Sequence, residues 1–233
     1  MMSVNDPIPF VAAITGGLLP AFLWLWFWLR EDSRHPEPRR LIALAFLAGM
    51  VAVALVIPLE QWVEPRLPDQ TAVFIAWSAI EELTKFALAW ITVLRLPQND
   101  EPLDSVIYMV VVALGFAAAE NTLFLLSPLA GVTWGQVILT GDYRFVGATL
   151  LHVLASATIG ASLALSFYKP RRVKWRYLTV GVILSLFLHG AFNVLILNTP
   201  SSALIRTFSF VWIGLVGLLA LIEFIKRIPA RIV

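Results

Sequence analysis

The sequence has 233 residues, of which 59% are hydrophobic and 14% are charged, and its formal net charge is +2. A soluble globular domain carries about 25% charged residues, so this composition excludes an ordinary soluble protein and predicts one that lies in a membrane. The sequence contains no cysteine, which excludes disulfides, thiolate nucleophiles and metal sites with cysteine ligands.

Seven apolar stretches are long enough to cross a bilayer, because a transmembrane helix needs about 20 residues. In chain order they cover residues 8–29, 41–59, 71–94, 105–126, 145–168, 177–197 and 203–225. The loops are too short to hold a soluble domain; the longest, 127–144, has an apolar centre that is too short to span. We therefore predict a single integral-membrane domain over residues 1–233, an all-α polytopic transmembrane helix bundle with about seven spans.

The basic residues indicate how the bundle is oriented. If the N-terminus lies outside, thirteen Lys and Arg residues fall in inner loops and the C-terminal tail, and only Arg66, Arg144 and Arg206 fall outside. Basic loops stay on the inner side of a membrane, so the sequence predicts an N-out and C-in protein. The basic loop 169–176 is explained by this orientation and by the lipid bilayer, which leaves no reason to expect nucleic acid as a partner.

The third apolar stretch carries three charged residues near its middle, Glu81, Glu82 and Lys85. An ionisable group at the centre of a bilayer costs about 2.5–3.5 kcal/mol on insertion scales, and each Leu, Ile or Phe returns only about 0.3–0.6 kcal/mol. The two glutamates stand three and four residues before Lys85, so all three share one helix face. This helix therefore needs polar partners inside a bundle, and we expect Lys85 to neutralise one glutamate.

Polar groups recur in the next three predicted helices, as Glu120, then His152, then His189 with Asn193. We count from the predicted outer helix ends at about 1.5 Å per residue. On this count Glu81, Glu120 and the two histidines all lie roughly 9–15 Å deep, in the outer half of the membrane. Ionisable groups are costly in lipid, so one layer supplied by four helices predicts a functional site.

Small residues accompany these groups on the same helix faces. We assign them to close helix packing, without a chemical role; they are Ser156, Gly160, Gly181 and Ser185.

Peptide hydrolysis in a membrane needs a base that activates water and donors that hold the oxyanion. A buried glutamate suits the base, and His189 and Asn193 stand one turn apart, where both can point donors at one oxygen. The sequence has no His-Glu-x-x-His zinc helix and no Gly-x-Ser-x-Gly element, and every aspartate falls in a predicted loop or tail. The same charges also suit a proton- or cation-coupled transporter, or a non-catalytic membrane scaffold.

Taken in chain order, the charged and polar motifs of these four predicted helices resemble those of the PrsW family of intramembrane proteases. That family belongs with the CAAX prenyl proteases and bacteriocin-processing enzymes. The motifs are Glu-Glu-x-x-Lys at 81–85, Phe-x-x-x-Glu-Asn at 116–121, the single His152, and His-x-x-x-Asn at 189–193. The stretch Arg-Glu-Asp-Ser-Arg-His-Pro-Glu-Pro at 30–38 also resembles the segment that follows the first helix in PrsW proteins.

The resemblance implies an intramembrane peptidase in which Glu81 and Glu82 form the core of the site and Glu81 is the base. It implies His189 and Asn193 as the oxyanion donors. Its substrates would be membrane-anchored proteins cut near the outer leaflet of a bacterial cell membrane, such as an anti-sigma factor in regulatory signalling.

By the same resemblance, Glu120 and His152 orient water or bind a metal. In the related CAAX proteases a histidine stands where this chain has Glu120, so its role is not transferred unchanged. A metal ion would take its ligands from Glu81, Glu120, His152 and His189, and zinc accepts such nitrogen and oxygen ligands. We expect a metal-free glutamic site, because the sequence has no close pair of histidines and because the resemblance implies glutamic chemistry.

Overall fold

A computed structural model describes residues 8–31, 35–126, 147–198 and 204–228. These residues form seven α-helices and no strand. The α-helices are α1 (Ile8–Glu31), α2 (Arg39–Val63), α3 (Gln70–Ala89), α4 (Pro102–Leu126), α6 (Ala148–Leu165), α7 (Arg171–Asn198) and α8 (Leu204–Ile225). A short 3₁₀ turn, η1 (Glu64–Arg66), follows α2, and a π-helical turn, η2 (Trp90–Leu94), extends α3.

The all-α membrane bundle predicted from the sequence is confirmed. In the described parts of the chain, six helices are long and apolar enough to cross a membrane. The seventh, α3, differs from them because Glu81, Glu82 and Lys85 fall in its centre. Together with η2 it covers residues 70–94, close to the predicted 71–94.

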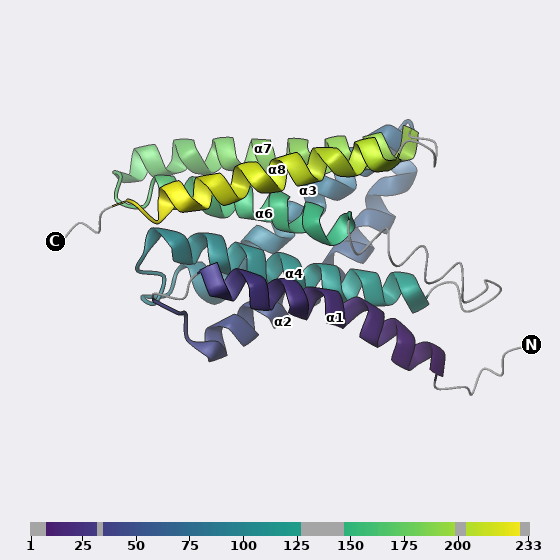
Figure 1. The fold of residues 1–233 in the computed structure, drawn as a ribbon. Helices are drawn as coiled ribbons and strands as arrows, with labels where there is room; N and C mark the ends of the chain where they lie inside the picture. Colours follow the sequence, from purple (N-terminus) through teal and green to yellow (C-terminus); the bar gives the residue numbers. More distant parts are fainter. Residues whose placement is uncertain (1–7, 32–34, 127–146, 199–203, 229–233) are drawn as a thin grey trace, which may run out of the picture.

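The helices pack in layers around α4. In Figure 1, α7 and α8 run along one side of the bundle and α1 and α2 along the other, with α4 and α6 between them. α4 packs against α1, α2 and α6, and α3 closes the bundle between α2 and α7. Almost every residue of α4 from Pro102 to Ala118 is buried, so this helix is the core of the fold.

α2 and α4 cross at two glycines. A Cβ atom on Gly115 would overlap the carbonyl oxygen of Phe46, and one on Gly49 would overlap that of Val112. Only glycine permits this approach, because its hydrogen leaves room for the backbone of the other helix. The crossing holds α4 against α2 and fixes the position of the helix that carries Glu120.

Two sequence predictions about the helices are corrected. The basic segment 169–176 is not a loop, because α7 begins at Arg171 and the Pro170 carbonyl accepts the N–H groups of Val173 and Lys174 at 2.8 and 3.1 Å. Asp104 is not in a loop either: it is buried in the first turn of α4 and accepts the N–H of Glu101 at 2.6 Å. The predicted long loop 127–144 lies outside the described residues.

Candidate active site

The charged face of α3 points into the bundle. Asp69 caps the start of α3 by accepting the N–H of Ala72 at 2.8 Å, which sets where the helix begins. About four turns later Lys85, which has no exposed surface, places its Nζ 2.6 Å from Glu82 Oε1 and 3.4 Å from Glu81 Oε2. The ammonium also lies 4.0 Å from the centre of the Phe116 ring, a cation–π contact. Lys85 thus compensates both glutamates from one turn away.

Glu82 is the most enclosed carboxylate of the site. Its Oε1 lies 2.9 Å from His189 Nδ1 as well as 2.6 Å from Lys85 Nζ. Its Oε2 accepts hydrogen bonds from Ser156 Oγ at 2.7 Å and from Ser185 Oγ at 3.4 Å. The expectation that these serines only pack was therefore incomplete. With four donors around it, Glu82 is suited to hold other groups in place.

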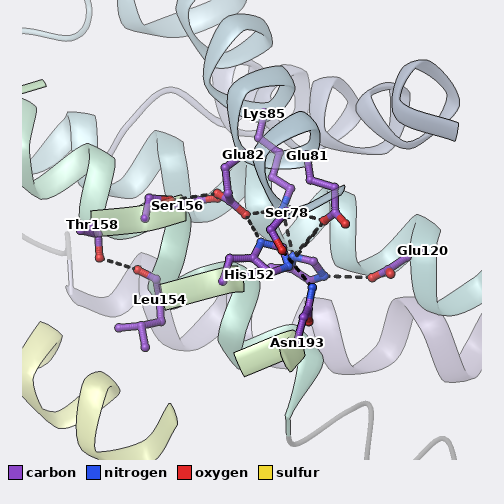
Figure 2. A network of polar contacts seen from close by, with 12 residues as sticks. Ser78, Glu81, Glu82, Lys85, Glu120, His152, Leu154, Ser156, Thr158 and Asn193 are labelled. Atoms are coloured by element: carbon purple, nitrogen blue, oxygen red, sulfur yellow. Dashed lines mark hydrogen bonds and ion pairs between the residues drawn. The ribbon is translucent and has the colours of Figure 1, made fainter. Parts of the chain in front are cut away.

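His152 is held between two helices. Its Nε2 lies 2.9 Å from Glu120 Oε2, and its Nδ1 lies 2.9 Å from Lys85 Nζ. Figure 2 shows Glu120 reaching the ring from α4 and Lys85 reaching it from α3. A carboxylate accepts and an ammonium donates, so these partners place the proton on Nε2 and the lone pair on Nδ1.

His189 has the complementary arrangement. Its Nδ1 donates to Glu82, which leaves the lone pair on Nε2. The two nitrogens that carry the lone pairs both lie near Glu81, whose Oε2 is 3.7 Å from His152 Nδ1 and 3.8 Å from His189 Nε2. The two rings are 5.0 Å apart between centroids. The histidines, 37 positions apart in the sequence, thus form a close pair in space, contrary to the first reason given for a metal-free site.

The donor set of Glu81, His152 and His189 fits a divalent metal. One ligand atom from each lies within 4.8 Å of the others, and all three residues are buried. Two imidazoles and a carboxylate are common zinc ligands, and metal-bound histidines usually donate their second N–H to a carboxylate. Here Glu82 and Glu120 are those carboxylates. Converging acceptors repel one another unless a cation lies close by; in this structure Lys85 Nζ lies 2.9 Å from His152 Nδ1 and 3.4 Å from Glu81 Oε2.

Asn193 lies at the edge of this network. Its Nδ2 donates to Ser78 Oγ at 3.0 Å (Figure 2). Ser78 Oγ in turn donates to the Phe74 carbonyl at 2.8 Å. The structure thus brings five of the six predicted residues into direct contact and links Asn193 to α3 through Ser78.

Sequence reasoning missed several polar contributors to the site. Ser78 shares a helix face with Glu81 and Glu82, a spacing that could have identified it. Glu60, in the last turn of α2, lies near enough to Glu81 and Glu120 for their charges to interact. The predicted second span ends one residue before it, at residue 59, so the predicted polar layer does not include it.

Known proteins match this chain over most of its length. It is 28% identical to Protease PrsW of Bacillus subtilis (strain 168) over 194 residues, which cover 79% of this chain and 83% of that protein. It is 28% identical to Protease PrsW of Geobacillus kaustophilus over 190 residues, and 26% identical to that of Clostridioides difficile over 179 residues. Those alignments cover 79% and 73% of this chain, and 79% and 74% of the two relatives. No solved structure gives a significant match.

The family comparison covers all of the helices that build the site. A model described as PrsW family intramembrane metalloprotease matches residues 37–222, a range that includes Glu81, Glu120, His152 and His189. With its six apolar helices, the chain is a multi-pass integral membrane protein. The family model matches most of the chain, and the bacterial relatives match it over a similar length. Together with the polar network inside the bundle, these matches show that the chain belongs to the PrsW family of intramembrane metalloproteases.

Proposed function

We propose that this chain hydrolyses peptide bonds of membrane-anchored proteins with water activated at Glu81, His152 and His189. The observation that carries the proposal is the convergence of one ligand atom from each of these buried residues within 4.8 Å. Burial of three such groups in a membrane helix bundle is costly, and it is explained if they act together on a reacting molecule.

We further propose that these three residues hold a zinc ion, in place of the metal-free site expected from the sequence. The support is the donor set, the second carboxylate on each imidazole, and the family's description as metalloprotease. Bound zinc would polarise the scissile carbonyl and make water a stronger nucleophile near neutral pH.

We propose that the Glu81 carboxylate transfers the proton during hydrolysis. Glu81 approaches Lys85, His152 and His189 through Oε2, so Oε1 is our proposed proton acceptor. When the water oxygen bonds to the carbonyl carbon, Oε1 takes the water proton; when the C–N bond breaks, it gives that proton to the leaving nitrogen.

The oxyanion needs a donor, and Asn193 supplies it in this proposal. His189 was the other donor expected from the sequence, but its Nδ1 proton points at Glu82 and its Nε2 carries a lone pair. An amide nitrogen has two hydrogens, of which Asn193 gives one to Ser78, so one remains for the substrate.

The substrate class follows from the location of the site. A cluster inside a multi-pass bundle reaches peptide bonds at or within the membrane, so we propose substrates with a transmembrane anchor. Glu120 is the most open member of the cluster, with 32% of its side chain exposed, and marks the side on which a substrate enters. By the family resemblance, an anti-sigma factor is the first candidate.

The test is cleavage of a single-pass reporter protein by the purified chain in liposomes. Glu81→Gln should lower the rate by about 100- to 10,000-fold, because the amide cannot accept a proton. Glu223→Gln makes the same chemical change on the surface of α8, where the side chain is 59% exposed, and should leave the rate unchanged. Undiminished cleavage by Glu81→Gln would refute the proposed centre.

Metal dependence is tested separately. A chelator should stop cleavage, added zinc should restore it, and His152→Ala or His189→Ala should lower the zinc content of the purified protein. Chelator-resistant cleavage that still requires Glu81 would replace the zinc proposal with a metal-free glutamic mechanism. Proton flux without cleavage, abolished by Glu81→Gln, would instead identify a transporter.

A further inference from the structure

A second site lies near the other end of the same helices. A cavity of about 720 Å³ opens between the end of α3 with η2, the end of α6 and the start of α7. On α6 and α7 it begins 11 residues from the catalytic histidines, at Leu163 and Leu178, which is about three helical turns. The cavity is therefore distinct from the candidate active site.

The wall of this cavity is apolar. Aliphatic and aromatic side chains supply most of it, among them Phe86, Ile91, Leu94, Leu163 and Leu178. The uncharged polar side chains that line it, Asn99 and Ser105, are already paired: Asn99 donates to the Leu94 carbonyl at 2.8 Å and accepts from Ser105 at 3.0 Å. A peptide backbone would find few partners here, whereas a hydrocarbon chain needs none.

The rim is cationic. Arg95, Arg171 and Lys174 line the cavity, and all three side chains are exposed. No acidic residue lines it, and within the described residues none of the three cations is in an ion pair. Three cations without an ion-pair partner in the described parts of the chain, beside an apolar wall, complement a ligand with one anionic group and a hydrocarbon tail.

Two tryptophans place the cavity at the level of lipid headgroups. Trp90 and Trp175 both line it and are 47% and 57% exposed. Indole rings favour the boundary between hydrocarbon and water, so the cavity opens where phosphates lie. With the predicted N-out orientation this is the inner leaflet, which carries anionic lipid.

We propose that this cavity binds one anionic phospholipid of the inner leaflet. An acyl chain lies against Phe86, Leu163 and Leu178, and the phosphate lies among Arg95, Arg171 and Lys174. A volume of about 720 Å³ is within the usual range for small-molecule sites, about 300–1,000 Å³.

The experiment is native mass spectrometry of the full chain in detergent, titrated with dioleoyl phosphatidylglycerol or with the choline lipid that has the same chains. The wild-type protein should bind one phosphatidylglycerol at least about 10-fold more tightly than phosphatidylcholine. Each basic side chain near an anionic lipid contributes a factor of about five, so Arg95→Gln/Arg171→Gln/Lys174→Gln should weaken phosphatidylglycerol binding by about 100-fold.

The matched control removes the same charge from the same end of the bundle. Arg40, Arg172 and Arg176 are exposed and do not line the cavity, so Arg40→Gln/Arg172→Gln/Arg176→Gln should change the affinity by less than about 3-fold. Ala87→Trp fills the cavity without altering the charge and should weaken the binding of both lipids.

Three results would overturn the proposal. They are equal affinity of the wild type for the two lipids, equal losses in the cavity variant and its control, and unchanged binding by Ala87→Trp. Saturable binding of a soluble acidic peptide that needs Arg95, with no lipid preference, would assign the cavity to a polypeptide instead.

Discussion

Lys85→Met tests how the buried charges of α3 are compensated. The Lys85 ammonium is fully buried and lies 2.6 Å from Glu82 and 3.4 Å from Glu81. Methionine keeps much of the side-chain volume but leaves two carboxylates without this partner. Loss of one member of a buried ion pair costs about 3–5 kcal/mol, so the free energy of unfolding in detergent should fall by that amount.

The double variant separates charge from packing. Lys85→Met/Glu82→Gln removes both partners, so its loss of stability should be about 1–3 kcal/mol smaller than the sum of the single losses. Lys226→Met is the control, since Lys226 pairs with Glu31 at 2.6 Å but keeps 24% of its side chain exposed and should cost about 1 kcal/mol or less. Wild-type stability of Lys85→Met, or strict additivity in the double variant, would refute this account of the site.

Three further predictions concern the surroundings of the site. Glu120→Gln should slow reporter cleavage by about 10- to 100-fold at nearly unchanged stability, because it alters the partner of a proposed ligand and not the core. Gly115→Ala should lower the free energy of unfolding by about 1–3 kcal/mol through overlap with a carbonyl of α2, whereas Gly217→Ala, with nothing within 4 Å, should not destabilise the protein. Ser156→Ala should cost about 1.5–3 kcal/mol because its hydroxyl serves a buried carboxylate; Ser162→Ala, which loses only a bond to its own helix, should cost less in the same unfolding assay.

The positions of the helices could be predicted from the sequence because a helix that crosses lipid must be long and apolar, and such segments are visible in the hydropathy of the sequence. The ends could not. α7 starts six residues before the predicted 177, since a helix can continue into water beyond its apolar part and Pro170 sets its first turn. Asp104 was misplaced for a different reason: hydropathy excludes a carboxylate from a span, whereas in α4 this carboxylate is buried and accepts the N–H groups of Asp100 and Glu101.

The members of the candidate site were predictable because ionisable side chains stand out against an apolar background. Their partners were not. Sequence spacing relates residues on one helix, so it paired Lys85 with the glutamates but gave no sign that His152 and His189 lie side by side. The proton positions on both rings also depend on contacts between helices, which only the packed bundle supplies.

The order in which the chain is synthesised affects how the charged helix α3 can be inserted into the membrane. Ser156 and His189, which surround Glu82 in the folded bundle, are translated 74 and 107 residues after it. When the nascent α3 first meets lipid these partners do not yet exist, and Lys85 on the same helix is the cation at hand. α3 therefore enters the bilayer with only one of its two carboxylates compensated from within the helix, and we expect its stable release from the insertion machinery to wait until α6 and α7 have been made.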